Sequence, residues 1–154
     1  MTTCYLPAGY RHITPYLIAR DAARAIDFYK RSLGATELLR LAGPDGKIMH
    51  AELKIGDSVV MLADEFPAMG ALSPQTVGGS PVILLLYVED VDAQTARAVE
   101  GGARVVRPIQ DQFYGDRSGT IIDPFGHQWT LATHQEDVAP EEIQKRMAAM
   151  CGGA

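Results

Sequence analysis

The chain has little of what would mark a secreted, disulfide-bonded or membrane-spanning protein. It has only two cysteines, Cys4 and Cys151, near its opposite ends, so a disulfide framework is not predicted and both thiols are expected to be incidental. No apolar run approaches the roughly 18 residues of a membrane span. The start lacks the basic and then apolar order of a signal peptide. We therefore predict a cytoplasmic protein with no membrane contact.

Positive charge is also scarce. The chain carries 14 Lys and Arg against 19 Asp and Glu, for a formal net charge of -5, and its basic residues are scattered rather than gathered. Nucleic-acid-binding domains normally leave a basic footprint, so no nucleic-acid partner is predicted. With 154 residues, 47% of them hydrophobic, the chain is long enough to bury a globular core.

Two segments of the chain repeat the same order of features: an apolar strand, an amphipathic helix that ends at Gly-Ala, and strands separated by Gly and Asp turns. A long period with only two copies indicates duplicated half-domains that share one core, because solenoids need at least three repeats. We predict an α+β fold of two βαβββ modules in one structural domain. The expected boundaries are 11–65 for module 1, 66–80 for a linker, 81–134 for module 2 and 138–150 for a C-terminal helix.

Capping residues and periodicity place the helices and strands. Asp21 and Asp90 are predicted helix N-caps. The expected buried positions, at helical spacing, are Ala22, Ala25, Ile26, Tyr29 and Leu33 in the first helix and Val91, Thr95, Ala98 and Val99 in the second. Strands are expected over 12–19, 35–41, 47–55, 58–63, 81–88, 103–108, 119–122 and 127–133. Phe125 and Trp129 are expected in the core, because large aromatic side chains are usually buried.

One predicted strand brings two residues of chemical interest together. Successive strand side chains alternate faces, so Met49, Ala51, Leu53 and Ile55 should point one way and Ile48, His50, Glu52 and Lys54 the other. An imidazole and a carboxylate on one face can act as an acid/base pair or as two metal ligands. Alternation alone would also produce an exposed polar face at this place.

A second group of polar residues lies near the end of the chain. Tyr114, Asp116 and Arg117 are expected in a Gly-containing loop, where polar groups often select a ligand at the mouth of a pocket. The alternative for this loop is an ordinary turn with a surface ion pair, which contributes little. Gln128 and Thr130 share one strand face, opposite Trp129, and are expected to face a cavity.

The order of these elements, together with Ile26-Asp27-Phe28-Tyr29 and Asp123-Pro124-Phe125-Gly126, resembles the vicinal oxygen chelate superfamily, which includes glyoxalase I, extradiol dioxygenases and bleomycin-resistance proteins. The resemblance runs from about residue 11 to 133. Three further motifs resemble its PhnB-like branch: Ile13-Thr14-Pro15-Tyr16, His50-Ala51-Glu52-Leu53 and Tyr114-Gly115-Asp116-Arg117. The resemblance implies a glyoxalase/bleomycin-resistance-type fold with a concave sheet cavity, assembled as a homodimer.

The resemblance also implies four metal-ligand positions, on the first and last strands of each module. In this sequence they match Thr14, Met61, Ile83 and Thr130. A divalent transition ion needs imidazole, carboxylate or thiolate ligands, normally three or more together. We therefore predict no metal and no other cofactor. A slip in the match could bring in His12, but one ligand would still be too few.

The sequence thus predicts a small-molecule binding protein that lacks the usual metal ligands of its relatives and sequesters an apolar or aromatic compound. The alternative is a lyase, isomerase or dioxygenase that uses relocated metal ligands or, without metal, His50 and Glu52 as an acid/base pair. A third reading, an interaction module, is not favoured by any exposed apolar patch in the sequence. The predicted ligand-binding residues are Thr14, Tyr16, His50, Glu52, Met61, Ile83, Leu85, Tyr114, Arg117, Gln128 and Thr130.

Overall fold

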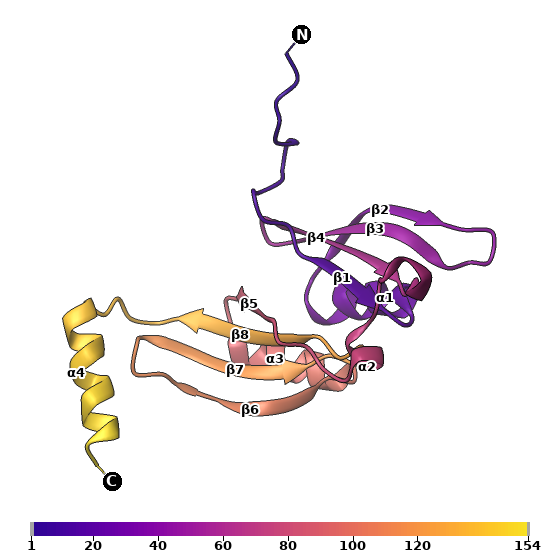
Figure 1. Cartoon of the computed structure of the whole chain (residues 1–154). Coiled ribbons are helices and arrows are strands. Elements are labelled where there is room, and N and C mark those ends of the chain that lie inside the picture. The colour runs from indigo at the N-terminus through magenta and orange to yellow at the C-terminus, as the bar shows by residue number, and fades with distance from the viewer. Residues whose placement is uncertain (1, 154) are drawn as a thin grey trace. The chain divides into compact units, whose positions relative to one another are not determined.

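The computed structural model describes residues 2–153 (Figure 1). The chain divides into two compact units. Unit 1 runs as far as Pro81 and also contains the short segment Pro124–His127, and unit 2 contains Val82–Asp123 and the chain from Gln128 onward. In the described residues, no helix combines the length and the apolar character that crossing a membrane would require.

Unit 1 contains one βαβββ module. Its elements are β1 (Tyr16–Ala19), α1 (Ala22–Ser32), β2 (Thr36–Ala42), β3 (Ile48–Ile55) and β4 (Ser58–Asp64). The sheet has the strand order β1-β4-β3-β2, in which β1 runs parallel to β4 and the other pairs are antiparallel. Two short helices follow, η1 (Pro67–Met69) and α2 (Pro74–Val77).

Unit 2 repeats this architecture. It contains β5 (Ile83–Tyr87), α3 (Val91–Glu100), β6 (Arg104–Asp111), β7 (Asp116–Ile122) and β8 (Gln128–His134), followed by α4 (Pro140–Cys151). The strand order β5-β8-β7-β6 matches that of unit 1 position by position, and β5 is likewise parallel to β8. The predicted α+β class with two βαβββ modules is therefore confirmed.

Both predicted helix caps are present. The Asp21 side chain accepts a hydrogen bond from the Arg24 amide at 3.2 Å, and the Asp90 side chain accepts one from the Ala93 amide at 3.0 Å. All five predicted core positions of α1 are buried, whereas α3 buries three of its four. The exception is Val99, which is 44% exposed because it lies about 100° around the helix from the buried Ala98.

The start of the first strand was predicted wrongly, and a proline explains the difference. The first strand begins at Tyr16 rather than at residue 12, since Pro15 has no N–H with which to extend the ladder; its carbonyl still accepts from the Met61 amide at 2.9 Å. The predicted linker 66–80 holds η1 and α2, each with a proline in its first turn, where the fixed φ of proline favours helix.

The aromatic residues near the Asp-Pro-Phe-Gly turn are buried, as predicted. In unit 1, Phe125 is 4% exposed and packs edge-on against Phe28 and Tyr29, with ring centroids 6.2 and 6.4 Å away. In unit 2, Trp129 is 3% exposed and its indole donates to Asp123 Oδ2 at 2.9 Å. These residues belong to the core rather than to a binding surface.

Candidate functional site

The sheet of unit 1 has one face covered by α1 and one open face. Strand register aligns four open-face residues across the sheet: Tyr16 pairs with Met61, Met61 with Glu52, and Glu52 with Leu39. Directly paired residues project from the same face. The alternation predicted for β3 holds for Ala51, Leu53 and Ile55, which are buried, but Met49 is 64% exposed, near a register irregularity at the end of β2.

Four side chains form a hydrogen-bonded chain on this open face. His50 Nε2 lies 3.0 Å from Glu52 Oε1, and the Tyr16 hydroxyl lies 2.9 Å from His50 Nδ1. The other carboxylate oxygen of Glu52 accepts a hydrogen bond from the Tyr10 hydroxyl. The side chains of His50 and Glu52 are 25% and 15% exposed, so the centre of this hydrogen-bonded group is only partly open to solvent.

The electrostatics of these four hydrogen-bonded side chains favour an ionised Glu52. Hydrogen bonds from His50 and Tyr10 hold the pKa of Glu52 below its usual value. The pKa of Tyr10 is raised by its hydrogen bond to Glu52, and that of Tyr16 is raised by burial and by the Glu52 charge. Near neutral pH the site therefore presents an ionised Glu52 as acceptor and two protonated phenols, Tyr10 bonded to Glu52 and Tyr16 bonded to His50.

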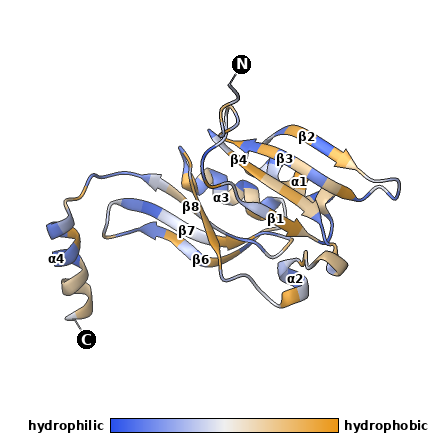
Figure 2. Cartoon of the chain, turned by 45° about the horizontal axis from the view of Figure 1, so that its top comes forward, coloured by the Kyte–Doolittle hydropathy of each residue, from blue (hydrophilic) through white to orange (hydrophobic). Residues whose placement is uncertain are grey.

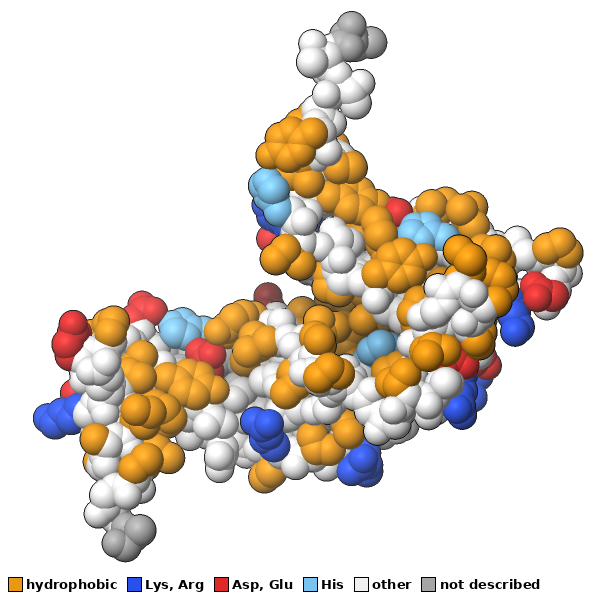
Figure 3. Space-filling view, viewed as in Figure 1, with side chains coloured by type: hydrophobic (Ala, Val, Ile, Leu, Met, Phe, Trp, Pro, Cys, Tyr) orange, Lys and Arg blue, Asp and Glu red, His pale blue; other side chains and the backbone are white. Residues whose placement is uncertain are grey.

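A cavity of about 580 Å³ adjoins the polar chain within unit 1. Tyr16 belongs to both, since it lines the cavity and contacts His50. The turn that joins β2 to β3, hydrophilic in Figure 2, contributes Asp45 and Lys47 to the wall. The remaining lining residues are Ile18, Ile48, Met49, Ala63, Asp64, Glu65, Phe66, Met69 and Ala71. Hydrophobic side chains gather on the face of unit 1 that Figure 3 presents.

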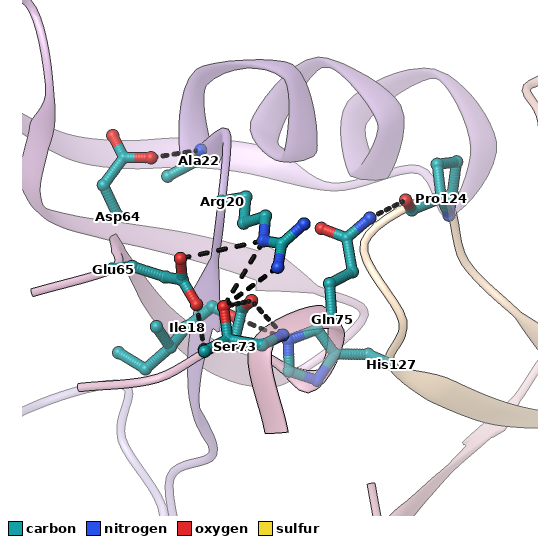
Figure 4. A network of polar contacts seen from close by, with 10 residues as sticks. Ile18, Arg20, Ala22, Asp64, Glu65, Ser73, Gln75, Pro124 and His127 are labelled. Carbon is teal, nitrogen blue, oxygen red and sulfur yellow. Dashed lines mark hydrogen bonds and ion pairs between the residues drawn. The ribbon is translucent and has the colours of Figure 1, made fainter. Parts of the chain in front are cut away.

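The far wall of the cavity is a loop that is anchored by a polar network (Figure 4). Glu65 accepts a hydrogen bond from the Ser73 amide at 2.7 Å and lies 3.8 Å from the Arg20 guanidinium. Asp64 accepts from two backbone amides, those of Ala22 at 2.8 Å and Ile48 at 2.7 Å. The Glu65 contacts fix the loop, and those of Asp64 join the end of β4 to α1 and β3.

The Glu65 contacts give the cavity wall a pH dependence. Hydrogen bonds from the Ser73 and Thr76 side chains and the Ser73 backbone, with the Arg20 charge, lower the pKa of Glu65 to about 2. A carboxyl whose pKa is lower in the folded than in the unfolded state stabilises the fold above the unfolded value and loses this effect as the pH falls to the folded one. The relevant window therefore runs from pH 4.5 down to about 2.

We expect Glu65→Gln to lower the melting temperature most above pH 4.5, the ordinary value of this carboxyl, and progressively less as the pH approaches about 2. The amide has no charge to lose, so its contribution stays flat across the window. Thermal unfolding followed by circular dichroism between these pH limits measures the difference. A difference that stayed constant across the window would contradict this role for Glu65.

Of the remaining predicted residues of unit 1, one lies on the open face of the sheet and one lies outside the sheet. Met61 lies on the open face, between Tyr16 and Glu52. Thr14 precedes β1, and its hydroxyl lies 3.5 Å from the Arg11 carbonyl. His127 Nε2 lies 2.9 Å from the Ile18 carbonyl of β1.

Four predicted residues lie together on the sheet of unit 2. Ile83 pairs with Gln128, and Leu85 pairs with Thr130, so register gives these four side chains one face. Thr130 also shares a hydrogen bond of 2.8 Å with Thr120. On this face Ile83, Leu85 and Tyr87 are 40%, 52% and 60% exposed, an apolar strip that the sequence pattern had not identified.

Arg117 and Tyr114 do not join these groups. Arg117 lies within β7, not in a loop, and its guanidinium contacts Asp92 of α3 at 2.8 and 2.9 Å and Asp111 at 3.1 Å. These carboxylates raise its pKa and direct it to the face that α3 covers. Tyr114 is 38% exposed and packs edge-on against Phe113, with centroids 5.3 Å apart.

Sequence reasoning missed two parts of the polar arrangement. Tyr10 lies outside every strand, and no periodic signal connects it to Glu52. In unit 2 the partners Tyr87 and His134 were missed: Asp116, expected in a loop, is buried in β7, accepts from the Tyr87 hydroxyl at 2.9 Å and lies 2.7 Å from His134 Nδ1. Asp116 and, to a smaller extent, Asp137 raise the pKa of His134. Alternation from Thr130 through residue 132 would have placed His134 on the same face.

The residues at the four implied ligand positions do not fit a transition metal. In unit 1 they are a hydroxyl and a thioether, and in unit 2 an aliphatic side chain and a hydroxyl that already bonds to Thr120. Across residues 2–153, no three His, Cys, Asp or Glu side chains are grouped in a way that could hold a metal ion. We therefore derive no chemical step through a metal at these positions.

Two four-stranded sheets of this order, each backed by one helix, define a βαβββ protein of the glyoxalase type. Residues 9–131 match the family model described as the Glyoxalase/Bleomycin resistance protein/Dioxygenase superfamily, and the chain belongs to this superfamily. The resemblance inferred from the sequence is confirmed.

Individual relatives agree with this assignment. The chain is 45% identical over 144 residues to the uncharacterized protein Mb0911c of Mycobacterium bovis, covering 92% of this chain and 95% of that protein. It is similar to the crystal structure of TioX from Micromonospora, with a TM-score of 0.64, 30% identity, and coverage of 80% of this chain and 98% of TioX. A PhnB protein from Bacillus cereus shares the fold, with a TM-score of 0.63, 18% identity, and coverage of 80% and 99%.

Proposed function

We propose that the chain binds a small apolar or aromatic molecule in the cavity of unit 1, without help from the metal-ligand positions of its superfamily. The cavity itself is the observation that carries this proposal. Its volume of about 580 Å³ lies in the range of small-molecule pockets, which are mostly apolar with a few polar groups that orient the ligand.

The composition of the lining supports an aromatic guest. Tyr16 and Phe66 offer ring surfaces, and Met49 and Met69 offer flexible thioethers, which pack well against aromatic rings. Phe66 and Met69 are 55% and 76% exposed. A ligand that covered these side chains would remove their apolar surface from water, at about 25 cal/mol per Å².

The polar chain beside the cavity supplies orientation. Glu52 is a hydrogen-bond acceptor beside the cavity, held in place by His50, which is itself hydrogen-bonded to Tyr16. A ligand with one polar end would direct that end toward Glu52. A binding protein of this kind would act by sequestration. We further propose that it works in the cytoplasm as a homodimer, a state that light scattering after size-exclusion chromatography would test.

A second candidate function is catalysis, and one observation favours it. The contact of 3.0 Å between His50 Nε2 and Glu52 Oε1 is the geometry of a carboxylate that orients an imidazole, which could then move a proton on a bound ligand. This reading predicts a lyase or isomerase with His50 and Glu52 as the acid/base pair. A metal-dependent dioxygenase would also need ligands for a redox metal, and His50 and Glu52 alone are too few to hold one.

The test of binding is a thermal-shift screen with naphthalene, hydroxylated naphthalenes and larger aromatic compounds. A ligand at about 100 times its Kd stabilises the folded state by about 2.7 kcal/mol, which raises the melting temperature measurably. Metal content is determined on the same purified protein. Absence of any shift across the aromatic panel would end the proposal, and near-stoichiometric metal that is required for binding would favour the metal-dependent alternative.

Variants of the polar pair separate binding from catalysis. We expect Glu52→Ala to weaken binding of a hydroxylated probe several-fold, because a charge-assisted contact is lost. His50→Ala removes only the neighbour of Glu52 and should weaken binding less; both variants leave the apolar contacts intact. Calorimetry measures the affinity, and product analysis of probe incubations measures turnover. Full affinity with loss of a detectable turnover in both variants would instead establish the acid/base pair.

A further inference from the structure

The two oxygens of Glu52 have different partners. One faces His50 of the same strand, whereas the other accepts from Tyr10, which lies outside the sheet. An ionised carboxylate only accepts hydrogen bonds, so the oxygen at Tyr10 selects for a donor. A phenol hydroxyl of the protein itself occupies that position in the structure.

The segment that carries Tyr10 is held by weak contacts. We call residues 7–14 the strap; it forms neither helix nor strand, and contact with the sheet begins at Pro15, whose carbonyl accepts from the Met61 amide. Arg11 contacts Asp57 at 2.9 Å, but their side chains are 67% and 81% exposed, and exposed ion pairs of this kind contribute little. His12 contacts Tyr5 at 3.1 Å, also at the surface. Releasing Tyr10 from Glu52 would therefore break few contacts that stabilise the fold.

The acceptor oxygen and the cavity lie within reach of one ligand. Glu52 and Tyr16 sit in the same row of the sheet, separated by Met61 on the strand between them. Neighbouring strands are about 4.8 Å apart, so two strand spacings are about 10 Å, close to the length of a two-ring aromatic molecule. Tyr16 marks the edge of the cavity.

We propose that Tyr10 is an internal stand-in for the ligand: the cavity takes a phenolic aromatic compound whose hydroxyl replaces that of Tyr10 on Glu52, while the strap moves away. The inference rests on the proposed function, because the far ring of a ligand held at Glu52 enters the unit 1 cavity beside Tyr16. It adds the chemical class, a hydroxylated aromatic, and an autoinhibitory contact that the ligand must displace.

The test compares beta-naphthol with its methyl ether, which has the same rings and no hydroxyl donor. Binding of each to the full chain is measured by calorimetry. A hydrogen bond to a charged group contributes more than the roughly 10-fold cost of displacing Tyr10, so we expect the naphthol to bind the wild type several-fold more tightly than the ether. Glu52→Ala should remove this discrimination.

The Tyr10→Phe variant tests the strap directly. It removes the competing hydroxyl, so binding no longer requires displacement, and the apparent Kd for the naphthol should fall by about 10-fold if the closed strap is populated about nine-tenths of the time. The affinity for the ether should change by less than about 2-fold, because ether binding does not use the acceptor. Tyr5→Phe is the matched control: its hydroxyl contacts His12, and we expect its loss to change neither affinity.

A third readout follows the strap itself. The amide resonances of Gly9 and Arg11 should shift on addition of the naphthol and stay in place with the ether. Equal binding of both probes to the wild type, or equal changes in both for Tyr10→Phe, would overturn the stand-in while leaving cavity binding established. Failure of both probes to bind the wild type would overturn the proposed function, and this inference with it.

Discussion

Replacing Ala71 with tryptophan should abolish binding of aromatic probes, with a loss of affinity on the order of 100-fold or more, equivalent to the removal of most apolar ligand contacts. Ala71 lines the cavity and is only half-buried, so an indole there can project into the cavity without displacing core side chains. Its backbone pairs with Phe66 through hydrogen bonds of 2.9 and 3.1 Å, which the substitution retains. Calorimetric titration with beta-naphthol measures the loss.

The control for this variant is Ala96→Trp, which adds the same ring at an exposed position of α3 in unit 2. It should bind the probe as the wild type does, and circular dichroism should show both variants folded. If Ala71→Trp were folded and bound the probe with unchanged affinity, the ligand would have to lie elsewhere in the chain, and the assignment of the unit 1 cavity would be wrong.

The fold could be predicted from the sequence because its signals are local. Asp21 and Asp90 mark where the two helices begin, and the buried stripe of α1 recurs at helical spacing. The register of β3 follows from alternation, which put His50 and Glu52 on one face. The start of β1 was misplaced because the run of suitable residues continues through the proline that interrupts it.

The site was less predictable because its parts come from segments without periodicity. Tyr10 reaches Glu52 from the strap, a contact between positions far apart in sequence, and no pattern in either segment indicates the other. The wall with Phe66 and Met69 depends on η1, which forms where a loop was expected. Arg117 was expected at a pocket mouth, but Asp92 on the neighbouring helix binds it, a partner that sequence spacing does not specify.

The same dependence on long-range contacts makes Asp64 the position where we expect the largest loss of stability. Its carboxylate accepts from the amides of Ala22 and Ile48 at 2.8 and 2.7 Å, and both residues are at most 2% exposed. Asp64→Ala removes two hydrogen bonds to a charged group and leaves two buried donors unpaired. The free energy of unfolding should fall by about 2–4 kcal/mol.

Urea unfolding followed by circular dichroism measures this loss as a lower midpoint at constant slope; circular dichroism is preferred because the only tryptophan of the chain, Trp129, lies in unit 2. Asp45→Ala is the matched control. Asp45 also lines the cavity, but its carboxylate accepts a hydrogen bond within its own turn, from the Lys47 amide at 3.1 Å. Its replacement should therefore lower the free energy of unfolding by less than about 1 kcal/mol. Hydrogen exchange of the Ala22 and Ile48 amides should accelerate in Asp64→Ala alone. Equal losses in the two variants would show that the carboxylate does not join β3 and β4 to the start of α1, and the cavity wall would then need another anchor.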